Sequence, residues 1–584
     1  MGLVPWSKLA VLLCAALTTV NGAQIPLTPP LSSHFLKSAT PALWDFNVTP
    51  NLNSTSHLIF DTVASLSQHW TNTRYRNGHN IVPGTVPVGT LLYHGTDKHE
   101  VPAGPEWTAT DPEHSYLFCR SAPTIDGSSS GCWHLTLVVT RPLKVLYFDG
   151  SSAAKMYGGS MDTQDIVIWG EVKPDWTFSE RTRINELCEW GREFGLDGFV
   201  RMEMDFEIML CDFTVAVEIV SFLNLNSGMN RGRHRPPSKP PGREPSFEPV
   251  PSFPPPNDDV SSILQYRVIE AGVWHNTYPG ETRINLDLNG LISFYDTDLF
   301  PSLAVARFGQ ERWKHRLQGL SVVDSKAFQT RIREVLEQIG HTGSGIDWST
   351  LIRVVVDRYA ERLEILQYLL NSTSTVEQAK RVQKHLRSMV IPYILHTSVP
   401  NSDFNNHSWA LPVYEHCATT HTRYISSIPS ILTRMTKSES LILRSVQEVS
   451  KEICRVVVGM WAEGVELGLD AISPASLSSV PARKFESVEI INAVRRWQER
   501  TEGLMAWLDW SVWVKCRPAC GYEEICYLPT WPFIPGSGHG PRPPRPDVGQ
   551  YRVKAQLQGA DDGEEDPVLP QPKCIRRVEP FTGI

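Results

Sequence analysis

A proline-rich segment between residues 226 and 257 constrains the fold of this chain more than any other feature. It contains ten prolines and few apolar residues, within a chain of 584 residues. Because proline fixes φ and lacks a backbone N–H, such a segment favours an extended conformation over a helix or a sheet interior. It therefore predicts a linker between two folded units, one on each side.

The first 23 residues are typical of a secretory signal peptide. Lys8 precedes the apolar run Leu9–Val20, and Val20-Asn21-Gly22 supplies small residues for cleavage. That run is too short to span a bilayer, and no later segment has the roughly 18 uncharged apolar residues that a membrane helix needs. We therefore expect a secreted protein that does not cross a membrane. Four glycosylation sequons fit this route: Asn47, Asn53, Asn371 and Asn406.

The cysteine count agrees with secretion. Of eleven cysteines, Cys14 would leave with the signal peptide, and the even number that remains favours disulfides in an oxidising compartment. For the last four the spacing matches no standard zinc knuckle, so disulfides are favoured over a metal there. Proximity along the chain suggests three pairs: Cys119 with Cys132, Cys188 with Cys211, and Cys417 with Cys454.

Composition and periodicity indicate an α+β protein. The net charge of −8 and the hydrophobic fraction of 41% are those of a globular chain, and no basic excess suggests a nucleic-acid partner. Strand-like runs before the linker predict a domain that contains a β-sheet over 24–225. Helical spacing and two capping boxes, Ser374 with Glu377 and Thr436 with Glu439, predict a mainly α-helical domain over 258–535. The tail 536–584 is rich in Gly, Pro and acidic residues, a composition that predicts disorder apart from Cys574.

The segment Leu91–Thr96 places an imidazole, His94, next to a bare backbone, Gly95, at the end of an apolar strand. A glycine at this position lets a ligand approach the main chain, whose N–H and C=O groups can pair with a carboxamide. The pattern is therefore suited to one end of a nucleotide.

Residues further along the chain extend this hypothesis. The rings of Trp107 and Phe118 can sandwich a flat heterocycle, and Glu207 can stabilise the positive charge that develops as a glycosidic bond breaks. Taken singly, each residue also fits a structural role, with the aromatic rings in a core and Glu207 on a solvated strand face. Their order and spacing favour the chemical interpretation.

This ordered series resembles the ADP-ribosyltransferase superfamily, most closely its poly(ADP-ribose) polymerase-like branch with a His-Tyr-Glu triad. The resemblance covers roughly residues 85–225. Its segments follow one another as Leu91–Thr96, Trp107–Cys119, Gly131–Phe148, Asp197–Val200 and Glu207–Asp212. The whole chain also resembles a group of long secreted fungal proteins, a likeness that implies no activity.

The superfamily resemblance implies a mixed β-sheet for the domain over 24–225 and NAD as the substrate. It also assigns a role to each motif residue. The implied roles are ribose binding for His94, backbone pairing with the nicotinamide amide for Gly95, the triad tyrosine's place for Trp107, a carboxamide hydrogen bond for Ser115, nicotinamide stacking for Phe118 and catalysis for Glu207.

The motifs depart from the family pattern in two places. Trp107 and Phe118 stand where the family has tyrosines, so both hydroxyls are missing while the rings remain. Asp205, two residues before Glu207, resembles the acidic-x-Glu pair of the arginine-modifying members, and alternation along a strand puts both carboxylates on one face. That pairing extends the catalytic set to Asp205.

Two functions follow as hypotheses. The first is a secreted NAD-dependent ADP-ribosyltransferase or NAD glycohydrolase that passes ADP-ribose to a protein acceptor or to water. The second is a non-catalytic secreted interaction or scaffold protein with a degenerate domain of the same fold. A third, weaker hypothesis is a hydrolase that cleaves another glycoside through Asp205 and Glu207.

Overall fold

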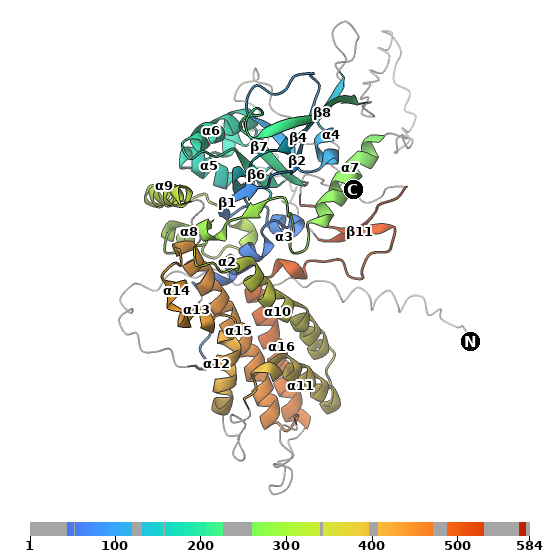
Figure 1. Ribbon diagram of the computed structural model, residues 1–584. Helices are drawn as coiled ribbons and strands as arrows, with labels where there is room; N and C mark the ends of the chain where they lie inside the picture. Colours follow the sequence, from blue (N-terminus) through green and yellow to red (C-terminus); the bar gives the residue numbers. More distant parts are fainter. Residues whose placement is uncertain are drawn as a thin grey trace, which may run out of the picture.

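A mixed β-sheet forms one end of the molecule and a helical bundle forms the other, as the computed structural model shows (Figure 1). The structure describes residues 44–51, 53–119, 131–155, 158–202, 204–225, 260–338, 343–395, 407–470, 487–530 and 571–579. The expected signal peptide, the proline-rich linker and most of the expected tail lie outside these residues.

The sheet has ten strands in the order β10-β1-β5-β6-β7-β3-β2-β4-β8, with β9 paired to β1. Neighbouring strands are antiparallel except β5 and β6, which are parallel, so the expected α+β class with a mixed sheet is confirmed. The strands are β1 Asn80–Val86, β2 Leu91–Thr96, β3 Glu106–Ala109, β4 Cys132–Val139, β5 Leu143–Phe148, β6 Gly198–Met202, β7 Phe206–Leu210, β8 Val217–Leu225, β9 Asn285–Leu286 and β10 Ile292–Ser293.

Helices from both sides of the proline-rich segment cover the sheet. On one face, Phe199 of β6 and Met209 of β7 belong to a core with Ile166, Leu187 and Phe328 of three covering helices. Strands β9 and β10 also come from beyond the linker, so the sheet unit extends past residue 225. Its helices are α3 His69–Thr73, α4 Pro112–Tyr116, α5 Asp162–Trp169, α6 Glu180–Arg192, α7 Val260–Trp274, α8 Pro301–Ala306 and α9 Val322–Glu337.

The bundle contains long amphipathic helices, as the sequence periodicity predicts. The capping box of α15 is confirmed: the Thr436 side chain accepts from the Glu439 N–H while Glu439 accepts from the Thr436 N–H. The box of α11 was placed one residue early and consists of Thr375 and Gln378. The bundle helices are α2 Ser56–Ser65, α10 Trp348–Asn371, α11 Val376–Val390, α12 Leu411–Thr419, α13 Arg423–Ser427, α14 Pro429–Leu432, α15 Lys437–Glu466 and α16 Ser487–Leu508.

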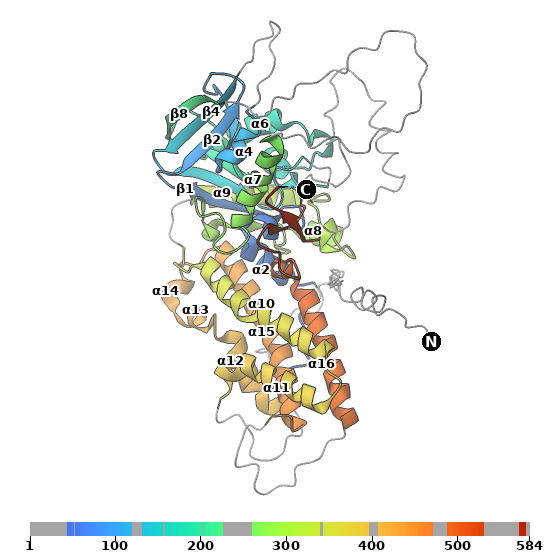
Figure 2. The same ribbon diagram turned by 90° about the vertical axis from the view of Figure 1, so that its right-hand side faces the viewer.

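Helix α2 joins the two ends of the molecule, and both views place it between sheet and bundle (Figure 1, Figure 2). It precedes the sheet in the chain, yet it packs against α10, α15 and α16. The ring of its Phe60 stacks on Trp510 with centroids 5.6 Å apart, and Asp61 forms a buried ion pair with Arg312 at 2.8 Å. One hydrophobic core therefore runs from the second face of the sheet into the bundle.

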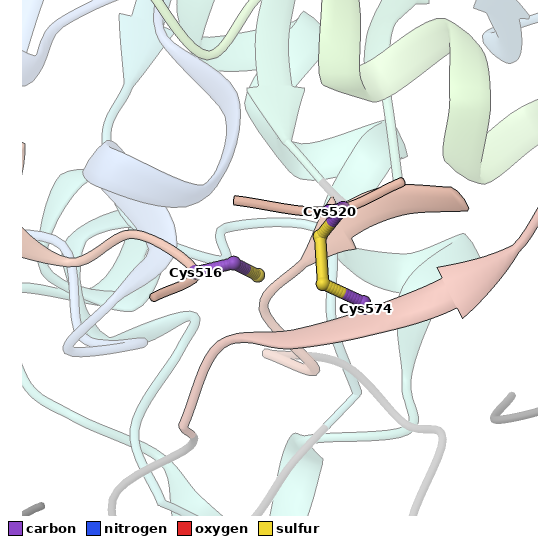
Figure 3. A group of neighbouring side chains, drawn as sticks. All are labelled: Cys516, Cys520 and Cys574. Atoms are coloured by element: carbon purple, nitrogen blue, oxygen red, sulfur yellow. A yellow bond between two sulfur atoms is a disulfide. The ribbon is translucent and has the colours of Figure 1, made fainter. Parts of the chain in front are cut away.

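Five disulfides tie the described chain together. The three predicted pairs are confirmed. The remaining four cysteines form Cys516–Cys526 and Cys520–Cys574, and the second of these bonds is visible in Figure 3, where Cys516 stands apart from it. Cys526 and Cys574 also face each other across a two-stranded sheet of β11 Glu524–Tyr527 and β12 Lys573–Arg576. None of the helices in the described ranges is long and apolar enough to span a bilayer.

Candidate functional site

Glu207 lies on β7 at the centre of one face of the sheet. Tyr93 pairs with Ala109, Ala109 with Glu207, and Glu207 with Arg201 across four adjacent strands. Residues directly opposite each other share a face, so these four side chains line up under the helices of the sheet unit. Glu207 is only 5% exposed.

The Glu207 carboxylate is part of a buried ion network. Its Oε1 accepts from the Arg201 Nε at 2.7 Å, and Arg201 also donates to Glu180 of α6 at 2.8 Å. Burial alone would raise the pKa of Glu180, but the positive charges of Arg201, Lys155 and Arg183 together outweigh burial and lower that pKa to about 2. Arg183 continues the network from Glu180 to Asp165. The protein therefore favours the ionised form of Glu180, and Arg201 pairs with the carboxylates of both Glu180 and Glu207.

His94 lies on the opposite face of the sheet from Glu207. Successive residues of a strand point to opposite sides, and Tyr93 shares the Glu207 face. The His94 ring packs edge-on against Phe213 at 5.6 Å, and its Nδ1 is 2.7 Å from the Trp107 carbonyl oxygen. Burial lowers the pKa of His94. The sheet thus separates the two predicted catalytic side chains.

Gly95 does share a face with Glu207, but its backbone is covered by α4. A Cβ at Gly95 would lie 2.1 Å from the Ser115 carbonyl oxygen and 3.0 Å from the Cys119 nitrogen. Glycine is therefore required here for helix packing. The Ser115 hydroxyl lies 2.7 Å from His134 Nε2 and donates to the Pro112 carbonyl oxygen.

The two predicted stacking rings lie in different environments. Trp107 packs beside the helical core of its face, and the Arg181 guanidinium lies over its ring at 4.9 Å. The Phe118 side chain is 51% exposed and has the His114 ring as a neighbour at 5.9 Å. The Arg181 guanidinium therefore occupies a position over the Trp107 ring where a stacked heterocycle would lie.

Asp205 belongs to a second polar cluster, at the end of the sheet unit where the β6–β7 turn meets α4 and α7. Its carboxyl oxygen lies near Asp111 and His275, with one ligand-type atom from each within 4.8 Å of the others. Burial raises the pKa of Asp205 well above its usual range, and the nearby Asp111 carboxyl raises it further. Asp205 and Glu207 therefore belong to different clusters.

Arg283 and Glu281 complete this second cluster. Arg283 donates to Glu281 at 2.6 and 2.8 Å and to the Asp111 carboxylate at 3.1 Å. The cluster borders two open cavities of about 640 and 420 Å³, which have Arg283 in common. The larger is also lined by Asp111 and His275, and the smaller by Tyr93 of β2.

Sequence reasoning missed most of the second cluster. Asp111 has a detectable signal, because it directly precedes a proline that opens a helix, a position where acids cap helix N-termini. His275 and Arg283 carry no such signal, since they follow the proline-rich segment and were assigned to the helical domain. Arg201 was also missed, although its place on the strand before Glu207 follows from the hairpin register.

Strands β1 to β8 lie within a region that is similar to a known family model. A family model described as the YPL277C N-terminal domain matches residues 48–132 and 124–233. The uncharacterized protein YOR389W of Saccharomyces cerevisiae is 25% identical over 545 residues, which cover 82% of this chain and 82% of that protein. The uncharacterized protein YPL277C of the same yeast is 32% identical over 216 residues, 30% of this chain and 43% of that protein.

These similarities bear on architecture and leave the activity open. The yeast YOR389W similarity extends over both the sheet and the bundle, so the two units occur together in a relative. Both relatives are fungal proteins, in agreement with the fungal likeness seen in the sequence. No solved structure matches this chain.

Proposed function

We propose that this protein is a secreted interaction protein whose sheet unit serves as a scaffold and does not turn over NAD. The observation that carries the proposal is that the polar groups expected to hold NAD are already engaged by the protein itself. Glu207 is bound by Arg201, and the Ser115 hydroxyl contacts His134 and Pro112.

The geometry of the expected donor site adds to this argument. His94 and Glu207 lie on opposite faces of the sheet, and Gly95 is covered by α4. A transferase must hold both ends of the donor in one pocket, because catalysis depends on orienting the reacting bond against the carboxylate. Breaking the buried Glu207–Arg201 pair to admit NAD would cost about 3–5 kcal/mol.

An exposed apolar edge offers a surface for an interaction role. Strand β8 ends the sheet order, and its side chains Ile219, Val220 and Leu223 are 54%, 56% and 54% exposed. Glu218 is the only charged residue in the strand. Edge strands of this kind pair with an extended segment of another polypeptide unless charge or proline protects them. Such a segment is the class of partner that we propose.

The decisive experiment measures nicotinamide release from NAD by the purified mature protein, with Glu207→Gln as the paired variant. We expect no release above the enzyme-free rate from either protein while circular dichroism shows both to be folded. Turnover by the wild type that disappears in Glu207→Gln would overturn the proposal and establish NAD-glycosidic chemistry. His94→Ala serves as the matched control, because its ring lies on the other face and should have no effect on such turnover.

A further inference from the structure

We propose that Asp111, Asp205 and His275 form a binding site for a first-row divalent cation such as Zn²⁺ or Mn²⁺. One carboxylate oxygen from each aspartate and one imidazole nitrogen lie within 4.8 Å of one another. Ligand distances of about 2.0–2.2 Å place any two ligands of one ion within about 4.4 Å, so small side-chain rotations bring all three atoms onto a cation.

Asp205 supplies the independent observation that points to a ligand. Its side chain is 0% exposed, and its Oδ1 accepts from the Phe206 N–H at 2.7 Å. Its Oδ2 accepts no hydrogen bond from any residue in the described ranges. The side chain within hydrogen-bonding reach of Asp205 is another acid, Asp111, and a hydrogen bond between them requires a proton between the two carboxyl groups. A cation between the two carboxylates takes the place of that proton.

The charge balance of the cluster fits a divalent ion. Asp111 and Glu281 both pair with Arg283, and the Asp205 carboxyl group lies close to Asp111. These three acids and one guanidinium carry a net charge of −2 once a cation has displaced the proton that the raised pKa of Asp205 favours. Arg283 is anchored by Glu281 through two hydrogen bonds of 2.6 and 2.8 Å. It therefore keeps its place when its weaker 3.4 Å contact with the His275 Nε2 gives way to the ion.

The three proposed ligands come from different parts of the fold. Asp111 precedes α4, Asp205 lies in the turn before β7, and His275 follows the last residue of α7. The close approach of α7 to the turn depends on Gly272, where a Cβ would lie 2.5 Å from the Met204 carbonyl oxygen. The site therefore exists only because the chain beyond the linker returns to the sheet.

The ligand set and the cavity define the chemistry of the site. Two carboxylate oxygens with one imidazole nitrogen suit Zn²⁺ or Mn²⁺ better than Ca²⁺, which prefers six to eight oxygens. Asp111 and His275 line the cavity of about 640 Å³. Three protein ligands leave a coordination position open toward that cavity for water or an anionic group. This inference is independent of the proposed interaction function, since it involves neither Glu207 nor β8.

The test uses tag-free mature protein, stripped with a chelator and titrated calorimetrically with ZnCl₂, MnCl₂ and CaCl₂. We expect one Zn²⁺ or Mn²⁺ per chain, a rise in the thermal midpoint on binding, and at least a tenfold weaker affinity for Asp205→Asn and for His275→Ala. The control Glu113→Gln changes an acid that lines the same cavity outside the ligand set. Its affinity should stay within about twofold of wild type.

Two results would overturn the site. One is the absence of Zn²⁺ and Mn²⁺ binding by wild-type protein whose circular dichroism shows an intact fold. The other is unchanged affinity in Asp205→Asn, a variant expected to fold because it replaces a buried carboxylate by a neutral side chain of the same shape. If His275→Ala does not fold, Asp205→Asn decides alone.

Discussion

Replacing Glu207 by glutamine tests whether the Glu207 carboxylate has a structural or a catalytic role. The change removes the negative charge of a buried carboxylate, which accepts a hydrogen bond from the Arg201 Nε at 2.7 Å. Loss of one partner of a buried pair costs about 3–5 kcal/mol. Arg201 keeps Glu180 as a partner, and glutamine keeps one acceptor oxygen, so we expect a smaller loss of about 2–3 kcal/mol in the free energy of unfolding.

Urea unfolding at neutral pH, followed by circular dichroism, measures this loss. With a denaturant slope of about 3 kcal/mol per molar, the midpoint should fall by about 1 M. The matched control is Glu106→Gln, because Glu106 of β3 in the same sheet pairs with the exposed Arg181 of α6. Exposed pairs contribute at most about 1 kcal/mol, so the control midpoint should move much less.

A second substitution tests whether Arg201 is the cause. In a protein that already carries Arg201→Met, Glu207→Gln should lower the free energy of unfolding by at least about 1 kcal/mol less than in the wild type. The reason is that the Glu207–Arg201 interaction is already lost in the Arg201→Met protein. Glu207→Gln with wild-type stability would refute the reasoning. Glu207 would then be free of Arg201 in solution, as an open catalytic cleft requires.

Three further predictions concern the packing, the pH response and the disulfides. Gly95→Ala should lower the free energy of unfolding by about 1–3 kcal/mol through overpacking against α4. Gly104 has open space around it, so the control Gly104→Ala should leave the free energy of unfolding unchanged. Equal urea midpoints for the two variants would contradict this prediction. Burial raises the pKa of Asp149 to about 6 from 3.8, so its contribution to stability is present at low pH and lost as pH rises through 6. Asp149→Asn should therefore reduce the fall in unfolding free energy between pH 4 and pH 7 by up to about 3 kcal/mol, and an unchanged pH profile would exclude this cause. Replacing both Cys188 and Cys211 by alanine should lower the free energy of unfolding by about 3 kcal/mol, because the disulfide closes a loop across 23 residues. An unaltered thermal midpoint in calorimetry would contradict this prediction.

The features that the sequence determined by itself are local. Apolar runs before the linker predict β-strands, and helical spacing with a capping residue predicts α15 from its first turn. The pairs Cys119–Cys132, Cys188–Cys211 and Cys417–Cys454 also followed from proximity along the chain. Each of these depends on residues that are near in sequence, where spacing and short loops limit the possible geometries.

Tertiary structure decided which chemical groups meet. The motif order put His94 and Glu207 into one site, but strand pairing sets the face of each side chain, and a position one residue along the strand changes that face. Asp205 was singled out from the sequence, while its neighbour His275 arrives from beyond the proline-rich segment. Long-range packing onto the sheet brings them together, and the pattern of neighbouring residues carries no information about it.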